Sequence, residues 1–207
     1  MLLGRSASSG DALLTHRTKS TARSATPPSS HSIPINDFAN ICPEGMIRLS
    51  GPLEHDNIVN GDGLRAVIWT QGCPNHCPGC QNPETWDYEA GFLISIDEIM
   101  ERLSKFRGQT GLTFCGGEPF VQPKACKEIA DRVRKEFGWD VWSFSGFTYE
   151  QIKKAGGEAW EFLKSLDALI DGPFILSQKD LSLKYRGSRN QRLLHLEYGT
   201  GKILAKE

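Results

Sequence analysis

From residue 64 onward, short apolar runs alternate along the chain with segments in which apolar residues recur at helical spacing. Apolar runs bounded by turn residues are typical of strands, whereas a recurrence every three or four positions is typical of helices. The pattern predicts strands over Leu64–Thr70, Gly111–Cys115, Asp140–Ser145 and Ala168–Asp171. It predicts helices over Ile96–Phe106, Ala125–Phe137 and Ala159–Leu166, and a further helix after Thr148.

Two of the predicted helices carry start signals. Ser95 and Glu98 have the spacing of a capping box directly before the first helix. Thr148 and Gln151 repeat that spacing before the third. Strands that alternate with helices favour a parallel sheet with right-handed crossovers. The predicted fold class is therefore α/β with a mainly parallel sheet, in which ligands bind at the carboxyl ends of the strands.

The composition is that of an ordinary globular protein. Of the 207 residues, 39% are hydrophobic and 24% are charged, so the chain can bury a sizeable core in one domain. A formal net charge of -1 offers no long-range attraction to nucleic acid or to an anionic membrane. Because the longest apolar runs fall far short of the roughly 20 residues that span a bilayer, we expect a soluble protein without either partner.

The first 45 residues differ in composition from the rest. Residues 1–35 are rich in serine and threonine and show no sustained apolar period. Four basic residues and one acidic residue give them a net charge of +3, a pattern that superficially resembles a transit peptide. We predict a disordered or non-native extension over 1–45 and one domain over 46–207. Translation from Met46 is a further hypothesis, which peptides from residues 1–45 in a mass spectrum would contradict.

Three of the six cysteines lie within eight positions, directly after the first predicted strand. Cys73, Cys77 and Cys80 have the spacing C-x3-C-x2-C, and the prolines and glycine between them favour a compact loop with three sulfur atoms facing one centre. Without an apolar signal-peptide core ahead of them, a metal or redox site in a reducing, cytoplasmic compartment is favoured over a disulfide framework. The scattered cysteines, expected to be inert thiols, are Cys42, Cys115 and Cys126.

Two kinds of metal site are consistent with this loop. A closed zinc site needs four protein ligands, usually in two separated pairs, and the sequence has no second C-x2-C. His76 could supply a fourth ligand, although a solvated loop residue is the simpler interpretation. An iron-sulfur cluster on three thiolates leaves one iron without a protein ligand, and reactive metal sites have such an open position. The spacing favours the cluster and leaves zinc open.

A glycine-rich turn follows the second predicted strand. Gly116 and Gly117 let the backbone approach a ligand closely, and Glu118 brings a carboxylate, which suits a cationic group, to the same edge of the sheet. Taken alone, the turn is an ordinary strand end before Pro119. Its position beside the cysteine loop favours a binding role.

The cysteine triad together with Gly116–Pro119 resembles the radical S-adenosylmethionine superfamily, whose hallmarks are C-x3-C-x2-C and a GGEP-type turn. Further segments narrow the resemblance to the family of proteins that activate anaerobic ribonucleoside-triphosphate reductase. These segments are Ile58–Arg65, Asn82–Trp86, Ser145–Phe147, Asp171–Phe174 and Tyr185–Gln191. The resemblance covers residues 46–196.

This resemblance implies a compact, incomplete (βα) barrel of the radical S-adenosylmethionine type, with a [4Fe-4S] cluster on Cys73, Cys77 and Cys80. It implies that S-adenosylmethionine binds the fourth iron and is cleaved reductively to a 5′-deoxyadenosyl radical, which takes a hydrogen from a glycine of the reductase catalytic subunit. The implied electron donor is a reduced flavodoxin or ferredoxin, and no side chain acts as acid or base. The implied cofactor contacts are Gly79, Cys80, Gln81, Gly116, Gly117 and Glu118, with Ser145 near the ribose.

Several other positions allow two interpretations. Gly79 stands where many members of the superfamily carry an aromatic residue against adenine, and a glycine there is similar to the reductase-activating branch. A basic cluster could dock on the reductase, although a solvated face is the default: Lys184, Arg186, Arg189 and Arg192. Two strand-end carboxylates are either site contacts or turn formers: Asp167 and Asp171. Three tryptophans are expected in packing and not as electron relays: Trp69, Trp86 and Trp142.

Two alternative functions stay open on the sequence. One is another radical enzyme, either the activase of a different glycyl radical protein or a small-molecule enzyme of deazapurine synthesis. The other is a non-catalytic protein that binds zinc or an iron-sulfur cluster. Reductive cleavage of S-adenosylmethionine by the reconstituted protein separates these classes.

Overall fold

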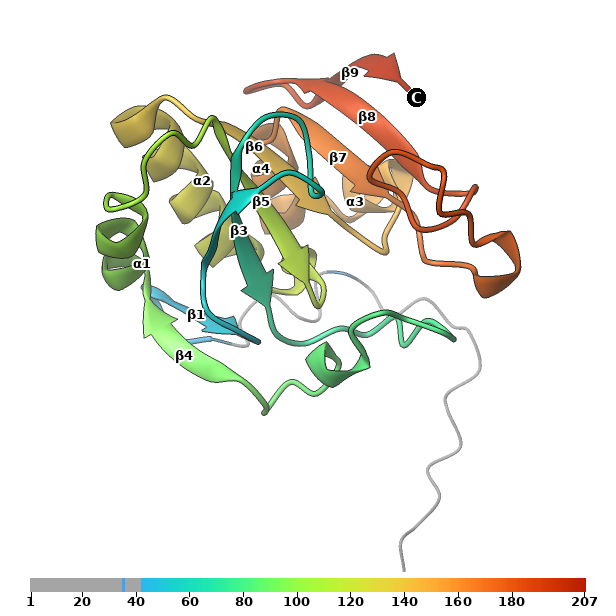
Figure 1. Ribbon diagram of the computed structural model, residues 1–207, viewed down its shortest axis with the longest axis horizontal. Helices are drawn as coiled ribbons and strands as arrows, with labels where there is room; N and C mark the ends of the chain where they lie inside the picture. The colour runs from blue at the N-terminus through green and yellow to red at the C-terminus, as the bar shows by residue number, and fades with distance from the viewer. Residues whose placement is uncertain (1–34, 36–41) are drawn as a thin grey trace, which may run out of the picture. The chain divides into compact units, whose positions relative to one another are not determined.

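The computed structural model describes Ile35 and residues 42–207 (Figure 1). The predicted extension over 1–45 therefore lies almost wholly outside the described residues, and the boundary at residue 46 stays a prediction. Ile35 itself is buried in the larger core. None of the helices in residues 42–207 has the length and apolar character that a membrane crossing requires.

The described residues form one sheet and the helices that pack on it. The strands are β1 Met46–Leu49, β2 Glu54–Asn57, β3 Arg65–Thr70, β4 Phe92–Ser95, β5 Gly111–Gly116, β6 Asp140–Phe144, β7 Ala168–Asp171, β8 Arg192–Glu197 and β9 Lys202–Lys206. The helices are α1 Ile96–Leu103, α2 Pro123–Phe137, α3 Tyr149–Ala155 and α4 Gly157–Lys164. Short 3-10 turns occupy Pro83–Thr85, Pro119–Val121 and Leu176–Gln178.

The sheet is mixed. Its strands run in the order β4-β1-β3-β5-β6-β7-β8-β9, and β2 also pairs with β3. The pairings β3–β5, β5–β6 and β6–β7 are parallel, as predicted, whereas the five pairings that involve β1, β2, β4, β8 or β9 are antiparallel. The prediction of a mainly parallel sheet was wrong because the outer strands were not foreseen. The α/β class is confirmed, and the incomplete (βα) barrel stays a prediction.

The predicted helices are all present, with small differences at their ends. Ser95 caps α1 by accepting a hydrogen bond from the backbone N of Glu98, and a complete capping box starts α3. Helix α1 ends at Leu103, before the predicted Phe106, because the chain turns there with hydrogen bonds that span three residues instead of four. Helix α2 ends where Gly138 adopts a left-handed conformation with φ of 71°.

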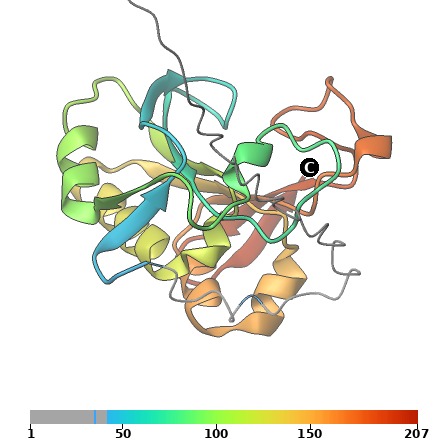
Figure 2. The same ribbon diagram turned by 90° about the horizontal axis from the view of Figure 1, so that it is seen from below.

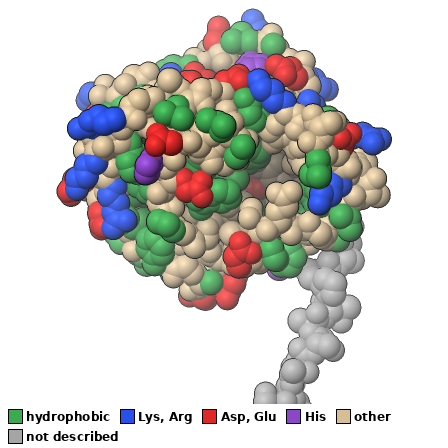
Figure 3. Space-filling view, viewed as in Figure 1, with side chains coloured by type: hydrophobic (Ala, Val, Ile, Leu, Met, Phe, Trp, Pro, Cys, Tyr) green, Lys and Arg blue, Asp and Glu red, His purple; other side chains and the backbone are tan. Residues whose placement is uncertain are grey.

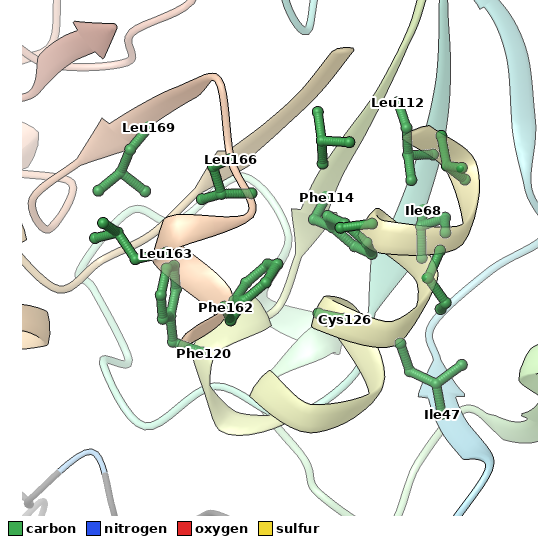
Figure 4. Packing of buried hydrophobic residues seen from close by; sticks show 14 of the residues in the cluster. Ile47, Ile68, Leu112, Phe114, Phe120, Cys126, Phe162, Leu163, Leu166 and Leu169 are labelled. Carbon is green, nitrogen blue, oxygen red and sulfur yellow. The ribbon is translucent and has the colours of Figure 1, made fainter. Parts of the chain in front are cut away.

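The two faces of the sheet carry different cores. Alternate strand residues, among them Ile68 and Phe114, pack against α1 to α4 in the larger core, which Figure 4 shows in part. Phe162 of α4 lies 5.5 Å from Phe114 between ring centroids. The four helices lie on this side (Figures 1 and 2). The opposite face has a smaller core around Trp142, to which no helix contributes.

The amino-terminal half of that opposite face is filled by a buried arginine. The Arg65 side chain is fully buried below the Trp142 ring, 5.0 Å from its centroid. Its guanidinium donates to Thr113 Oγ1 at 2.6 Å and to the Leu112 carbonyl at 2.7 Å, and it pairs with Asp140 at 2.6 Å. Because this half is closed, a cavity on the face can open only at the carboxyl ends of the strands.

Candidate metal and cofactor site

The carboxyl ends of β3, β5 and β6 border a cavity of about 670 Å³. Trp69 pairs in register with Cys115, and the pairing of Phe114 with Ser143 places Phe144 beside Cys115. Trp69, Cys115 and Phe144 all line the cavity. Since side chains alternate along a strand, this is the face opposite the helices. The cavity thus lies where open α/β sheets bind ligands, and Figure 3 shows this side of the molecule hollowed.

Segments that follow different strands surround the cavity. Residues 71–86 follow β3, and residues 172–191 follow β7; both views of the ribbon show the two segments side by side (Figures 1 and 2). A Cβ atom at Gly79 would lie 2.9 Å from Leu176 Cδ1, so the cysteine loop packs directly on the second segment. Gly79 itself, with φ of 75°, is exposed and does not line the cavity.

The cysteine loop is held by backbone hydrogen bonds. The backbone N of Cys73 donates to the Trp86 carbonyl at 3.2 Å, and the backbone N of Cys80 donates to the Cys77 carbonyl at 3.0 Å. Cys73, Cys77 and Cys80 are half-buried free thiols that line the cavity. The three cysteines therefore border one cavity, whereas the arrangement of their sulfur atoms around one centre stays a prediction.

Each sulfur atom has a nearby hydrogen-bond donor. Burial raises the pKa of the Cys73 thiol to about 12, although Asn75 donates to its sulfur at 3.8 Å. Burial also raises the pKa of Cys77, against a hydrogen bond from the Phe174 backbone, and the backbone N of Asn82 donates to Cys80 Sγ at 3.4 Å. Within residues 42–207, no three cysteine, histidine or acidic side chains are arranged to hold a metal ion. Metal ligation by cysteine requires the thiolate form, which the raised pKa values of Cys73 and Cys77 disfavour.

The glycine turn lies directly against the start of the cysteine loop. The backbone N of Gly117 donates to the Thr70 carbonyl, and that of Glu118 donates to the Gly72 carbonyl, each at 2.8 Å. A Cβ atom at Gly117 would lie 2.5 Å from the Gly72 carbonyl oxygen. Gly116 adopts φ of 97°, which favours glycine. The glycine turn and the cysteine loop are thus in contact.

Glu118 joins three loops by hydrogen bonds. Its Oε1 accepts from the backbone N of Phe120 at 3.1 Å and from Ser145 Oγ at 2.9 Å. Its Oε2 accepts from the backbone N of Gly146 at 2.7 Å and from Asn75 Nδ2 at 3.2 Å. Burial raises the pKa of Glu118 to about 7, against the effect of these donors. The side chain therefore holds the walls of the site together, and four donors already occupy its oxygen atoms.

The other predicted contacts differ in position. Gln81 and Ser145 line the cavity, although the Ser145 hydroxyl donates to Glu118. His76 is exposed and stacks on Trp86 with ring centroids 4.8 Å apart, and it does not line the cavity. This arrangement gives no support to His76 as a zinc ligand.

Comparison with known proteins decides the family. The family described as "4Fe-4S single cluster domain" matches residues 59–194. The chain is 34% identical over 148 residues to the anaerobic ribonucleoside-triphosphate reductase-activating protein of Escherichia coli K12, covering 68% of this chain and 94% of that one. The chain belongs to this family of activating proteins.

Further relatives carry the same name. The protein of Haemophilus influenzae is 33% identical over 145 residues, which cover 65% of this chain and 90% of that one. The protein of phage T4 is 37% identical over 150 residues, which cover 66% of this chain and 87% of that one. A solved structure, QueE from Escherichia coli, has a TM-score of 0.43 at 16% identity and covers 57% of this chain and 59% of that chain.

In this member of the activating-protein family, the segment after β7 contributes residues that the sequence analysis did not place in the site. The cavity lining from this segment includes Phe174, Leu181, Tyr185 and Arg186. Lys184 Nζ and the Tyr185 hydroxyl donate to Asp62 at 2.8 and 2.7 Å, which ties this segment to the loop before β3. The resemblance of Tyr185–Gln191 to the family was the available signal, but it named no contact.

Three members of the basic cluster form ion pairs, and two of these three remain exposed to solvent. Lys184 pairs with Asp62, and Arg189 pairs with Asp180 at 3.0 Å. Arg192 pairs with Glu150 at 2.7 Å and with Asp171. Lys184 and Arg189 are exposed, as the default prediction has it, whereas Arg192 is only 23% exposed and the prediction is corrected for that residue.

The strand-end carboxylates are structural. Asp171 is fully buried, pairs with Arg192 and accepts from the backbone N of Tyr149 at 2.7 Å. Asp167 pairs with Arg134 and accepts from the backbone N of Val141 at 2.7 Å. Neither lines the cavity. The tryptophans follow the packing prediction: Trp69 and Trp86 line the cavity, and Trp142 lies in the smaller core.

Proposed function

We propose that this protein activates anaerobic ribonucleoside-triphosphate reductase with a [4Fe-4S] cluster on Cys73, Cys77 and Cys80 and with S-adenosylmethionine. The chemistry supplied by these groups when bound is reductive cleavage to a 5′-deoxyadenosyl radical, which generates the glycyl radical on the reductase catalytic subunit. The supporting observation is that three thiols and the Gly116–Gly117 turn border one cavity in a chain of this family.

The donor set suits an iron-sulfur cluster. The three thiols of one loop match a cluster that keeps one iron open to a small ligand, and a fourth thiol, Cys115 on β5, also lines the cavity. The donors near the sulfur atoms, from Asn75, Asn82 and Phe174, are the kind of group that stabilises thiolates and tunes a cluster. Ligation would require the thiols to lose their protons and to move together.

The residues around the thiols would bind the cofactor and shield it from water. Backbone at Gly116 and Gly117 approaches the cavity with no side chain in the way, which suits the amino-acid part of the cofactor. The Trp69, Phe144 and Phe174 rings supply apolar walls that exclude water from a reactive intermediate. The four hydrogen bonds that Glu118 accepts hold the loops around the cavity in their relative positions. Contacts from Cys80, Gln81 and Glu118 to the cofactor belong to the same proposal, whereas Gly79, which lies outside the cavity lining, would act through the shape of the cysteine loop.

We also propose a fold type, a compartment and an electron donor for this protein. The parallel strands β3, β5, β6 and β7 would form the centre of an incomplete (βα) barrel. Residues 46–207 would form a single radical S-adenosylmethionine domain in the cytoplasm. A reduced flavodoxin or ferredoxin would supply the electron.

The test uses cysteine variants. Reconstituted anaerobically and reduced, the wild type should cleave S-adenosylmethionine and give a glycyl radical signal by electron paramagnetic resonance when the reductase is present. Cys73→Ala, Cys77→Ala and Cys80→Ala should each abolish cleavage. Cys126→Ala is the matched control, because Cys126 is fully buried in the larger core away from the cavity.

Three outcomes would contradict the proposal. Cleavage retained in any triad variant would exclude the ligand assignment. Zinc without iron in protein purified without oxygen would favour a structural metal site. Cleavage without a glycyl radical on the reductase would point to another radical enzyme.

A further inference from the structure

The cavity is lined by three charged side chains whose charges are not equally compensated. They are Glu118, Lys184 and Arg186. The oxygen atoms of Glu118 accept four hydrogen bonds, and Lys184 pairs with Asp62 at 2.8 Å. Within residues 42–207, the Arg186 guanidinium has neither an acidic partner nor a hydrogen bond, and its Nε is buried without an acceptor. A buried donor of this kind costs free energy unless a ligand pairs with it.

The residues on either side hold Arg186 in place. The Tyr185 hydroxyl donates to Asp62, and its ring lies 5.5 Å from that of Trp142 between centroids. Tyr185 adopts φ of 60°, which a tyrosine takes only when its surroundings impose it. On the other side, Gly187 packs on Phe174, since a Cβ there would lie 3.1 Å from the ring. The arginine is thus presented from a fixed backbone, so less ordering opposes binding.

The position of Arg186 relates it to the cysteines. Phe174, which packs beside Gly187, donates a backbone hydrogen bond to Cys77. Across the same cavity, Trp69 and Trp86 each have a buried indole N–H that, within the described chain, lacks an acceptor. The cavity therefore contains more unpaired donors than acceptors, which suits a ligand with an anionic, acceptor-rich group.

We infer that Arg186 binds the carboxylate of the amino-acid part of S-adenosylmethionine. This inference rests on the proposed function. A guanidinium has five donors and no acceptor, so it excludes the ammonium and sulfonium groups and matches a carboxylate in a bidentate pair. Because a carboxylate has two oxygen atoms with about four lone-pair sites, binding to Arg186 is compatible with contact to a metal.

The experiment compares two ligands on the anaerobically reconstituted full-length protein, without reductant. The dissociation constants of S-adenosylmethionine and of its decarboxylated analogue are measured by equilibrium dialysis. Arg186→Met should raise the dissociation constant of S-adenosylmethionine by about 10- to 100-fold, because hydrogen bonds between charged groups contribute free energies of that size. The dissociation constant of the analogue should stay within about twofold of the wild-type value. Arg189→Met, on the same segment but paired with Asp180 and 70% exposed, should change neither constant.

The outcomes separate the inference from the proposed function. Equal weakening of both ligands, or no weakening of S-adenosylmethionine, would overturn the role of Arg186 alone. Failure of the wild type to bind either ligand would overturn the proposed function and this inference with it. Iron and sulfide content of each variant reports whether the site is intact. Arg186→Lys, which keeps the charge, should recover part of the loss; a constant equal to that of Arg186→Met would also contradict the inference.

Discussion

A single methyl group at Gly117 should separate the two motifs of the site. Gly117 has an ordinary φ, so alanine brings no backbone strain of its own. Its Cβ would, however, lie 2.5 Å from the carbonyl oxygen of Gly72 and 3.0 Å from that carbonyl carbon. Both atoms are backbone, so no rotamer change relieves the overlap. The turn must move away from the cysteine loop.

The size of the effect follows from two terms. Overpacking of this kind costs about 1–3 kcal/mol. Moving the turn also breaks or stretches the 2.8 Å hydrogen bond from the backbone N of Glu118 to Gly72, which contributes about 0.5–1.5 kcal/mol. We therefore expect Gly117→Ala to lower the free energy of unfolding by about 2–4 kcal/mol and to weaken binding of S-adenosylmethionine.

Urea unfolding followed by tryptophan fluorescence measures the first quantity, and equilibrium dialysis measures the second. Gly51→Ala is the matched control, because a Cβ there meets nothing within 4 Å and the backbone has no positive φ. That variant should stay within about 0.5 kcal/mol of the wild type. If Gly117→Ala were as stable as Gly51→Ala and bound the cofactor equally well, the reasoning from close backbone contact would be refuted.

Two further predictions concern the rest of the fold. Phe162→Ala should lower the free energy of unfolding by about 3–5 kcal/mol, measured in urea, because the ring is fully buried against Phe114 and Phe120; a loss below 1 kcal/mol would contradict this packing. Arg192 lowers the pKa of Glu150 to about 2, so their pairing stabilises the fold above the unfolded value of 4.5 and is lost as pH falls toward 2. The gap in melting temperature between the wild type and Glu150→Gln should therefore narrow over that range, and a constant gap would count against the pairing.

The central parallel strands and the helices were predictable because their sequences show clear apolar runs or helical periodicity. Strand β3 is a nearly continuous apolar run, and α2 repeats apolar residues at helical spacing over four turns. The outer strands carry no such signal. Strand β2, with the sequence EHDN, is almost wholly exposed, and only backbone pairing to β3 makes it a strand. Strands β1 and β4 have four residues each and pair across more than forty positions.

The candidate site was likewise predictable only in part. The cysteines and the glycine turn were predictable because spacing along the chain brings them to neighbouring strand ends. The position of the Cys115 side chain on the cavity face depends on strand register. Burial raises the pKa of this thiol to about 12. The four hydrogen bonds of Glu118 and the unpaired state of Arg186 depend on how distant loops close. No local sequence pattern predicts those contacts.

The hydrogen bonds from Lys184 and Tyr185 to Asp62 have a consequence that depends on dissolved salt. They link the loop before β3 to the segment after β7, and residues of both line the cavity. The side chains of Lys184 and Asp62 are 63% and 58% exposed, so dissolved ions screen their attraction. We therefore expect higher ionic strength to weaken the ion pair between Lys184 and Asp62, which joins the two segments that border the cavity.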